Sequence, residues 1–391
     1  MKNIVFQISI LFLAFTGCEY STVAQYKYSP PELTSDGLMV GTLDEVNIDS
    51  RYIRDAIVDI IGGKFREVHS LIIHRRGKLV LEEYFPGHSY KWDGANHYGE
   101  WVEWNRDVLH MIASDSKSIT SACIGIAVDQ GFIKSVHQSI FDYLPDYKEL
   151  NKDGKDKITI EHLLTMTSGL EANEWQAPYS SPANDVIALW FPPCEDPITC
   201  ILEKPLVREP GTYFNYFGGN MILLGEILKN ASGMNIDQFS KKYLFSPMGI
   251  DSINWSLIFP NGVYESAGGL ELTPRAMLKI GVLYLNNGVW EGEKILSEEW
   301  IKKSASSYGN NMNIKIPGTD GGRNGYGYSW WVKDYSTPWE KTSMYYACGW
   351  GGQYIMVFPE LETVVVFTGA NYTSRVRNFR ILEKYILPAI D

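Results

Sequence analysis

A serine and a lysine three residues apart are the residues of this sequence with the clearest potential for chemistry. Ser114 begins the run Ser114-Asp115-Ser116-Lys117, and no other serine has a lysine three positions later. Three residues make nearly one helical turn, so the hydroxyl and the amine share a helix face. A lysine whose pKa is lowered by burial can accept the serine proton, which makes the oxygen a nucleophile. The spacing therefore predicts nucleophilic catalysis by Ser114 with Lys117 as the base.

The surrounding sequence places this pair at the start of a buried helix. Residues 108–113 are mostly apolar, and a helix is predicted over 114–130 from its apolar positions, Ile119, Cys123, Ile124, Ile126 and Ala127. A serine at a helix N-terminus lies in the positive field of the helix dipole, which favours a developing oxyanion.

Other catalytic classes are excluded by what the chain lacks. The last histidine is His162, and no Gly-x-Ser-x-Gly occurs, so the nucleophile elbow and late histidine of an α/β-hydrolase are missing. His69 and His74, five apart on one predicted strand, point to opposite faces and are expected to be surface or packing residues. No phosphate loop, dinucleotide fingerprint or metal cluster is found, and no cofactor is expected.

Composition and charge agree with a globular enzyme. The 391 residues are 45% hydrophobic, carry a net charge of −11 and show no Lys/Arg-rich run, so no nucleic-acid partner is expected. The length allows two or three domains.

The N-terminus predicts export. Lys2 precedes an apolar run over residues 4–15, which is too short for a comfortable membrane span and is typical of a signal peptide over 1–17. The run ends in Thr16-Gly17-Cys18, which resembles a lipobox and predicts a lipid on Cys18 that anchors a periplasmic or cell-surface protein to the membrane. Simple secretion and an uncleaved anchor are the alternatives. Residues 18–45 are interpreted as a polar tether.

In an oxidising compartment the remaining cysteines acquire a structural meaning. Cys194 and Cys200 lie six apart in a Pro-rich stretch and form a local disulfide or remain two unrelated thiols. Cys123 is expected in the core, and no cysteine pair has zinc-ligand spacing with nearby histidines, so no metal site is predicted.

Elements at both ends of the chain predict the architecture. A helix over 50–61, a hairpin around Arg76-Gly77 and a long loop over 86–107 begin the chain; a second hairpin around Pro359-Glu360 and an amphipathic helix close it. The fold class is thus α/β, of the α+β kind. One antiparallel sheet domain is built from residues 46–130 and 260–391 and flanked by helices, with a mostly helical domain inserted over 131–259.

Several segments, in order, resemble one family. The Ser-x-x-Lys motif, the stretch over 160–170, the run from Glu209 to Leu224-Gly225, the glycines at 268–269 and Gly349-Trp350-Gly351-Gly352 look like the motifs of β-lactamase-like serine hydrolases. That group includes penicillin-binding proteins, class C β-lactamases, related esterases and 6-aminohexanoate-dimer hydrolases. The resemblance covers about residues 50–390 and implies their serine β-lactamase/DD-peptidase-like fold.

The resemblance also implies a second motif, usually Tyr-x-Asn, whose tyrosine relays a proton. Distance to the following Leu-Leu-Gly favours Tyr216, although Tyr216-Phe217-Gly218 lacks the asparagine. A literal Tyr213-Phe214-Asn215 is the alternative register. Asn220 is a candidate replacement for the missing amide.

The third motif appears as Trp350-Gly351-Gly352, where relatives have Lys-Thr-Gly or His-x-Gly. By family position, the N–H groups of Ser114 and Gln353 form the oxyanion hole. Lys341-Thr342-Ser343 only superficially mimics the motif. Because Trp350 replaces a carboxylate-binding cation, a small neutral ester or amide is the expected substrate.

Three functions follow from these observations. The favoured one is an exported serine hydrolase that forms an acyl-enzyme on Ser114, with Lys117 as base and Tyr216 as proton relay. The second is a β-lactamase or DD-peptidase. The third is a non-catalytic binding lipoprotein on the same fold, which the altered second motif keeps open. The sequence does not determine the oligomeric state.

Overall fold

The computed structural model describes residues 26–309, 311–336 and 341–390. The predicted signal peptide over 1–17 and the predicted lipidation site Cys18 lie outside the described residues. Within the described residues, no helix combines the length and apolarity needed to cross a bilayer.

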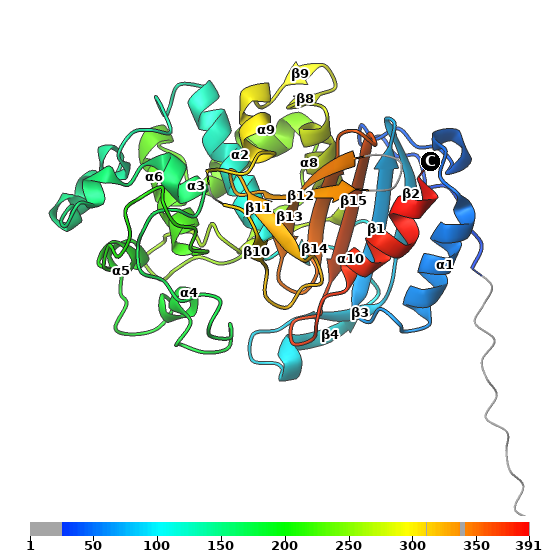
Figure 1. Cartoon of the computed structure of the whole chain (residues 1–391), viewed down its shortest axis with the longest axis horizontal. Helices are drawn as coiled ribbons and strands as arrows, with labels where there is room; N and C mark the ends of the chain where they lie inside the picture. The colour runs from blue at the N-terminus through cyan, green and yellow to red at the C-terminus, as the bar shows by residue number, and fades with distance from the viewer. Residues whose placement is uncertain (1–25, 310, 337–340, 391) are drawn as a thin grey trace, which may run out of the picture.

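An eight-stranded antiparallel sheet forms the centre of the molecule (Figure 1). Its order is β10-β11-β12-β13-β14-β15-β1-β2, so the N-terminal hairpin β1–β2 pairs with the last strand of the chain, as predicted. The strands, in sheet order, are β10 Ile314–Lys315, β11 Arg323–Tyr326, β12 Trp331–Ser336, β13 Lys341–Gly349, β14 Gln353–Phe358, β15 Thr363–Gly369, β1 Val68–Arg75 and β2 Lys78–Tyr84.

Helices cover both faces of this sheet, which explains why its central strands are apolar on both sides. On one face Tyr354 of β14 packs edge-on against Phe379 of α10 (Asn378–Ile381). On the other face α8 (Pro274–Leu285) lies against β14 and β15. There Gly281 leaves so little room that a Cβ atom would lie 2.5 Å from Val364. The first helix, α1 (Ser50–Ile61), is capped by Asp49 and packs against the C-terminal helical segment.

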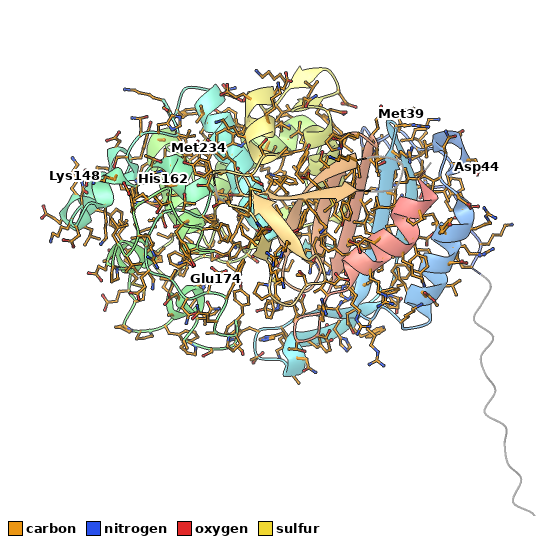
Figure 2. The ribbon with its side chains drawn as sticks, viewed as in Figure 1. Met39, Asp44, Lys148, His162, Glu174 and Met234 are labelled. Atoms are coloured by element: carbon orange, nitrogen blue, oxygen red, sulfur yellow. A yellow bond between two sulfur atoms is a disulfide. The ribbon has the colours of Figure 1, made fainter. Side chains whose placement is uncertain are left out.

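The helical side of the molecule comes from the middle of the chain. Figure 2 shows Lys148, His162 and Met234 on this side and Met39 and Asp44 at the opposite end, with Glu174 between them. Its elements are α3 Ile160–Leu164, α4 Asp185–Ala188, α5 Pro197–Leu202, α6 Gly219–Ser232, α7 Ile236–Ser240 and the short strand β6 Ile253–Trp255. The long helix α2 (Asp115–Asp129) contacts both α6 and β13, so it joins the two sides.

Short elements complete the chain. β5 (His110–Met111) and β6 both pair with β7 (Leu270–Leu272) in a three-stranded sheet. The hairpin β8–β9 (Val289–Trp290 and Glu293–Lys294) precedes α9 (Glu298–Ser304).

Two predictions about loops were wrong. The tether was expected to extend to residue 45, but Leu38 and Leu43 are buried and Val40 bridges to Leu79, because apolar side chains there reach the core. The stretch 86–107 was expected to be a long loop. It instead contains the hairpin β3–β4 (Gly87–Tyr90 and Tyr98–Val102), where His88 stacks on Tyr98 across the strands.

Candidate active site

Ser114 lies at the N-terminal end of α2, directly after a sharp turn that side-chain hydrogen bonds stabilise. The preceding residue, Ala113, has a φ of +48°, which is costly for a residue with a Cβ and turns the chain sharply from β5 into the helix. Ser116 stabilises this turn, since its hydroxyl donates to the Ala113 carbonyl at 2.6 Å and accepts from the Leu270 amide at 3.2 Å. The hydroxyl of Ser114 is thereby presented at the helix end rather than packed into the core.

Lys117 and Tyr216 both reach Ser114. The Lys117 Nζ donates to Ser114 Oγ and to the Ala267 carbonyl, each at 2.9 Å, and lies 4.9 Å from the centre of the Tyr216 ring. Burial lowers the pKa of Lys117, which favours the neutral amine that a base requires. Burial raises the pKa of Tyr216, so its phenol keeps a proton that it can donate. The three predicted residues therefore converge.

Three buried acids surround this group. Burial raises the pKa of Asp115 and Glu174, and it raises the pKa of Glu265 to about 7. Among the described residues, neither carboxyl oxygen of Asp115 has a hydrogen-bond partner, and neither does Glu265 Oε2. As anions these acids would hold Lys117 protonated, so their reluctance to ionise helps the amine to act as a base.

Tyr216, and not Tyr213, occupies the site. Tyr216 is only 7% exposed and stacks on Trp175 with ring centres 4.9 Å apart. Tyr213 is 56% exposed and lines neither of the two hollows in the protein surface that open beside Ser114 and are described below. Asn220 does not replace the missing asparagine. It is fully buried on α6, and its side-chain amide contacts the Met166 sulfur at 3.5 Å.

The end of β13 lies against the segment that carries Ser114. A Cβ atom on Gly349 would lie 2.2 Å from the Ile112 carbonyl oxygen, so only glycine permits this approach. The Gly349 carbonyl accepts a hydrogen bond from the Gly352 amide in the turn between β13 and β14. In a trans peptide the next N–H points the opposite way, so the Trp350 N–H faces away from β14. The N–H groups of Ser114 and Trp350 are therefore the candidates for a pair of main-chain donors to an oxyanion.

The prediction that Gln353 supplies an oxyanion donor does not fit this geometry. Gln353 begins β14, pairs with Gly349 and lies outside the residues that line the hollows. Its buried side chain donates to the carbonyls of Trp350 and Gly369 at 3.2 and 2.6 Å, which fixes the turn. The error arose because the strand ends before the glycine pair, so the donor position falls three residues earlier.

Of the third-motif residues, Trp350 and Gly351 line the site, whereas Gly352 shapes the turn next to it. Trp350 lines both hollows, and its indole N–H donates to the Tyr372 carbonyl at 2.9 Å. Gly351 lines one hollow with a φ of +92°, and Gly352, with a φ of +105°, shapes the turn behind it. Lys341 is the first residue of β13, at the end of the strand opposite Gly349. The nearby Ser343 hydroxyl donates to Glu360, so the Lys341-Thr342-Ser343 run does not form part of the active site.

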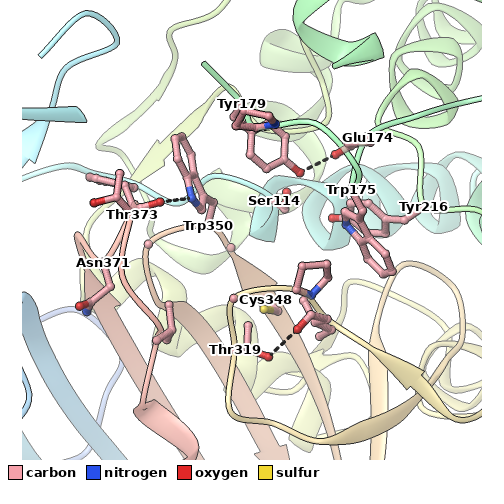
Figure 3. Close-up of a pocket in the computed structure, with 18 of the residues that line it drawn as sticks. Ser114, Glu174, Trp175, Tyr179, Tyr216, Thr319, Cys348, Trp350, Asn371 and Thr373 are labelled. Atoms are coloured by element: carbon pink, nitrogen blue, oxygen red, sulfur yellow. Dashed lines mark hydrogen bonds between the residues drawn. The ribbon is translucent and has the colours of Figure 1, made fainter. Parts of the chain in front are cut away.

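Two hollows share Ser114, Glu174, Tyr179 and Trp350 in their linings. Figure 3 draws residues that line the first hollow, with these four labelled. The first, of about 400 Å³, has a polar rim that includes Asn371, Thr373 and Ser374. The second, of about 410 Å³, is largely apolar; the residues that form its apolar wall are Tyr90, Trp92, Val186, Ile187, Trp190, Phe191 and Leu257. Among the described residues that line either hollow, Lys117 is the only lysine or arginine.

Sequence reasoning missed several of these residues. Glu174 and Tyr179 come from a loop without hydrophobic periodicity, and Tyr90 and Trp92 come from the stretch interpreted as a featureless loop. The missing asparagine at Gly218 was a usable signal, since it implied that another polar group lies nearby. Cys348, a buried free thiol that lines the first hollow, gave no signal at all.

The other predicted cysteine and metal features can be placed too. Of the two alternatives for Cys194 and Cys200, the structure has the disulfide, with Cα atoms 6.0 Å apart, and it buries Cys123 in α2. His69 and His74 are buried packing residues. Within the described ranges, no group of three or more metal-binding side chains comes together.

Comparisons with known proteins agree with this geometry. The family model described as beta-lactamase matches residues 63–383. The 6-aminohexanoate-dimer hydrolase of Paenarthrobacter ureafaciens is 24% identical over 204 residues, a match that spans 50% of the chain and only 50% of that relative. Among solved structures, a Bacillus anthracis protein provisionally assigned as a 6-aminohexanoate-dimer hydrolase superposes with a TM-score of 0.66 at 20% identity, covering 94% of this chain and 88% of the other. A family VIII carboxylesterase gives a TM-score of 0.62 at 16% identity, with 86% and 96% covered.

Proposed function

The chain belongs to the beta-lactamase family of serine hydrolases, and from this premise we propose that it cleaves a neutral ester or amide through an acyl-enzyme on Ser114. The observation that carries the proposal is the 2.9 Å contact between Ser114 Oγ and the buried Lys117 amine, beside Tyr216. A serine hydroxyl is a poor nucleophile until a neighbouring base accepts its proton.

The proposed acylation gives each of these groups a defined role. Neutral Lys117 accepts the Ser114 proton as Oγ attacks the substrate carbonyl carbon. The resulting oxyanion is held by the N–H groups of Ser114 and Trp350. Tyr216 donates its proton to the leaving alcohol or amine as that bond breaks, and Lys117 returns a proton to Tyr216. Water then attacks the acyl-enzyme, and the acid is released as Ser114 regains its proton.

The hollows support a neutral substrate that carries an apolar group. The second hollow has a wall of aromatic and aliphatic side chains beside Ser114. Two of these side chains, Phe191 and Leu257, are 43% and 39% exposed. Burying such surface against a substrate group is favourable. Among the described residues that line the hollows, no lysine or arginine other than Lys117 is present to pair with a substrate carboxylate. A Lys117 that acts as a neutral base does not supply that charge either, so a carboxylate near the reacting carbonyl is disfavoured.

One experiment separates this proposal from its alternatives. The purified protein is treated with a fluorophosphonate probe and assayed on p-nitrophenyl esters, short amides and a chromogenic cephalosporin, with S114A as the matched control. We expect labelling of wild type alone and faster cleavage of esters or amides than of the cephalosporin. Faster cephalosporin hydrolysis would instead support a β-lactamase or DD-peptidase. A wild type that is labelled no more than S114A would support a non-catalytic binding protein.

We also propose that the protein is exported and anchored by lipid on Cys18. The basis is the basic start, the apolar run and the Thr16-Gly17-Cys18 end. In a Gram-negative host, C18S should move the protein from the membrane fraction or leave it unprocessed. Unchanged processing and membrane association in C18S would contradict lipidation, with an uncleaved anchor as the remaining explanation.

A further inference from the structure

The second motif departs from the family pattern at Gly218, where an asparagine is usual. The backbone there has φ −59° and ψ −28°, which any residue can adopt, so the conformation does not require glycine. The space around it is tight, however. A Cβ atom on Gly218 would lie 3.1 Å from the Val186 side chain, 3.2 Å from the Ala267 Cβ and 3.5 Å from Glu174 Oε2. A longer side chain in this direction would therefore meet the carboxyl group of Glu174.

Glu174 fills this space and is held there by two short hydrogen bonds. Its Oε2 accepts from the Gly218 amide at 2.6 Å, and its Oε1 accepts from the Tyr179 hydroxyl at 2.8 Å. The residue is 3% exposed and lines both hollows beside Ser114. Figure 3 shows the bond between Tyr179 and Glu174 close to Ser114, with Tyr216 nearby.

Resting on the proposed function, we propose that Glu174 takes the place of the missing second-motif asparagine and positions Tyr216 for proton transfer. The bond to Gly218 fixes the turn between Tyr216 and α6. Trp175, the next residue, stacks on the Tyr216 ring with centres 4.9 Å apart, so one short segment contacts the tyrosine ring and also fixes the turn that follows it. The bond to Tyr179 fixes the wall that the two hollows share.

The test exchanges the acid for the amide. E174A removes both hydrogen-bond acceptors, and kcat should fall on the order of tenfold to a hundredfold, the effect of losing one or two buried partners, with KM changed little. E174Q keeps an oxygen for Gly218 and an amide for Tyr179, so its kcat should fall by less than about threefold. E174M keeps most of the side-chain volume but has no hydrogen-bond acceptor of this kind. A residue that only filled space would tolerate E174M as well as E174Q, whereas we expect E174M to lose as much kcat as E174A.

Gly218→Asn supplies the decisive comparison. In the wild-type background the new side chain competes with Glu174 for one space, and kcat should fall. In the E174A background the carboxyl group no longer occupies the space beyond the new Cβ, although Val186 and Ala267 still lie close to that Cβ. Gly218→Asn should there restore kcat by about fivefold or more, so its effect reverses sign. Gly218→Ala in the same background brings no amide and should restore nothing.

The outcomes distinguish the inference from the function on which it depends. Wild-type kcat in E174A, or an Asn at 218 that lowers kcat in both backgrounds, would overturn the role of Glu174 while leaving hydrolysis by Ser114 intact. Equal fluorophosphonate labelling of wild type and S114A would overturn the proposed function itself. Circular dichroism and thermal melting of each variant establish that it is folded.

Discussion

The approach of β13 to the Ser114 segment allows a sharp prediction for Gly349→Ala. The added methyl group would begin 2.2 Å from the Ile112 carbonyl oxygen and 2.9 Å from Gln353 side-chain atoms. An uncrowded contact needs about 3.4 Å or more, so the strand end and residue 112 must separate by roughly 1 Å. That shift moves the Trp350 N–H away from the carbonyl that Ser114 attacks.

The magnitude follows from two separate effects. Misplacing a reacting or positioning group by about 1 Å costs on the order of a hundredfold in rate. Overpacking a well-packed site costs about 1–3 kcal/mol in stability. With an unfolding entropy of about 2.1 cal/mol/K per residue, this loss lowers the Tm by only about 1–4 °C for a chain of this length. Gly349→Ala should thus be folded and nearly inactive.

The assay measures kcat/KM on the best p-nitrophenyl ester together with the melting temperature. Gly281→Ala is the matched control, since its Cβ would lie 2.5 Å from Val364 in the interface between α8 and the sheet, far from Ser114 in sequence and outside the lining of both hollows. The control should lose stability and keep its rate. Equal activity losses in the two variants, or full activity in Gly349→Ala, would refute the placement of the oxyanion donor.

Three further predictions concern the groups around the nucleophile. S114A should abolish ester hydrolysis, K117R should be inactive at every pH because its guanidinium stays charged, and the S114A/K117R double variant should be no worse than either, as judged by kcat/KM. Burial raises the pKa of Glu265 from 4.5 to about 7. The unfolded state therefore loses this proton first, and the free energy of unfolding of the wild type should fall as the pH rises between these values. Urea unfolding of wild type and E265Q at pH 5 and pH 8 should show this fall in the wild type and not in E265Q. W350K should shift relative kcat/KM toward carboxylate-bearing substrates by up to about a hundredfold, and an unchanged preference would contradict the assigned role of the Trp350 side chain.

The parts of the site that lie on regular elements could be predicted from sequence. Ser114 and Lys117 share a helix face by spacing alone. The choice of Tyr216 over Tyr213 rested on the family resemblance, through the distance to Leu223-Leu224-Gly225. The sheet built from both chain ends followed from the two hairpins. In each case a fixed period or a short connection determines the geometry.

The missed parts depend on contacts that no local pattern encodes. The donor assigned to Gln353 depended on where β13 ends, and a shift of three residues moves it from the start of β14 to the turn directly after β13. Glu174 and Tyr179 come together with Gly218 only because a loop folds over α6. Leu38 and Leu43 looked like tether residues because a few apolar side chains carry no periodicity, yet the core has room for them.

The pairing of β1 with β15 has a consequence for how the chain is made. Val68 and Gly369 are neighbours in the sheet although about 300 residues separate them, so the central sheet cannot close until nearly all of the chain has been synthesised. Contacts between such distant segments form slowly, because a long loop must close before they stabilise anything. Until then the edge of β1 that pairs with β15 remains unpaired. A C-terminal truncation that removes β15 should therefore leave aggregating chains rather than a smaller enzyme.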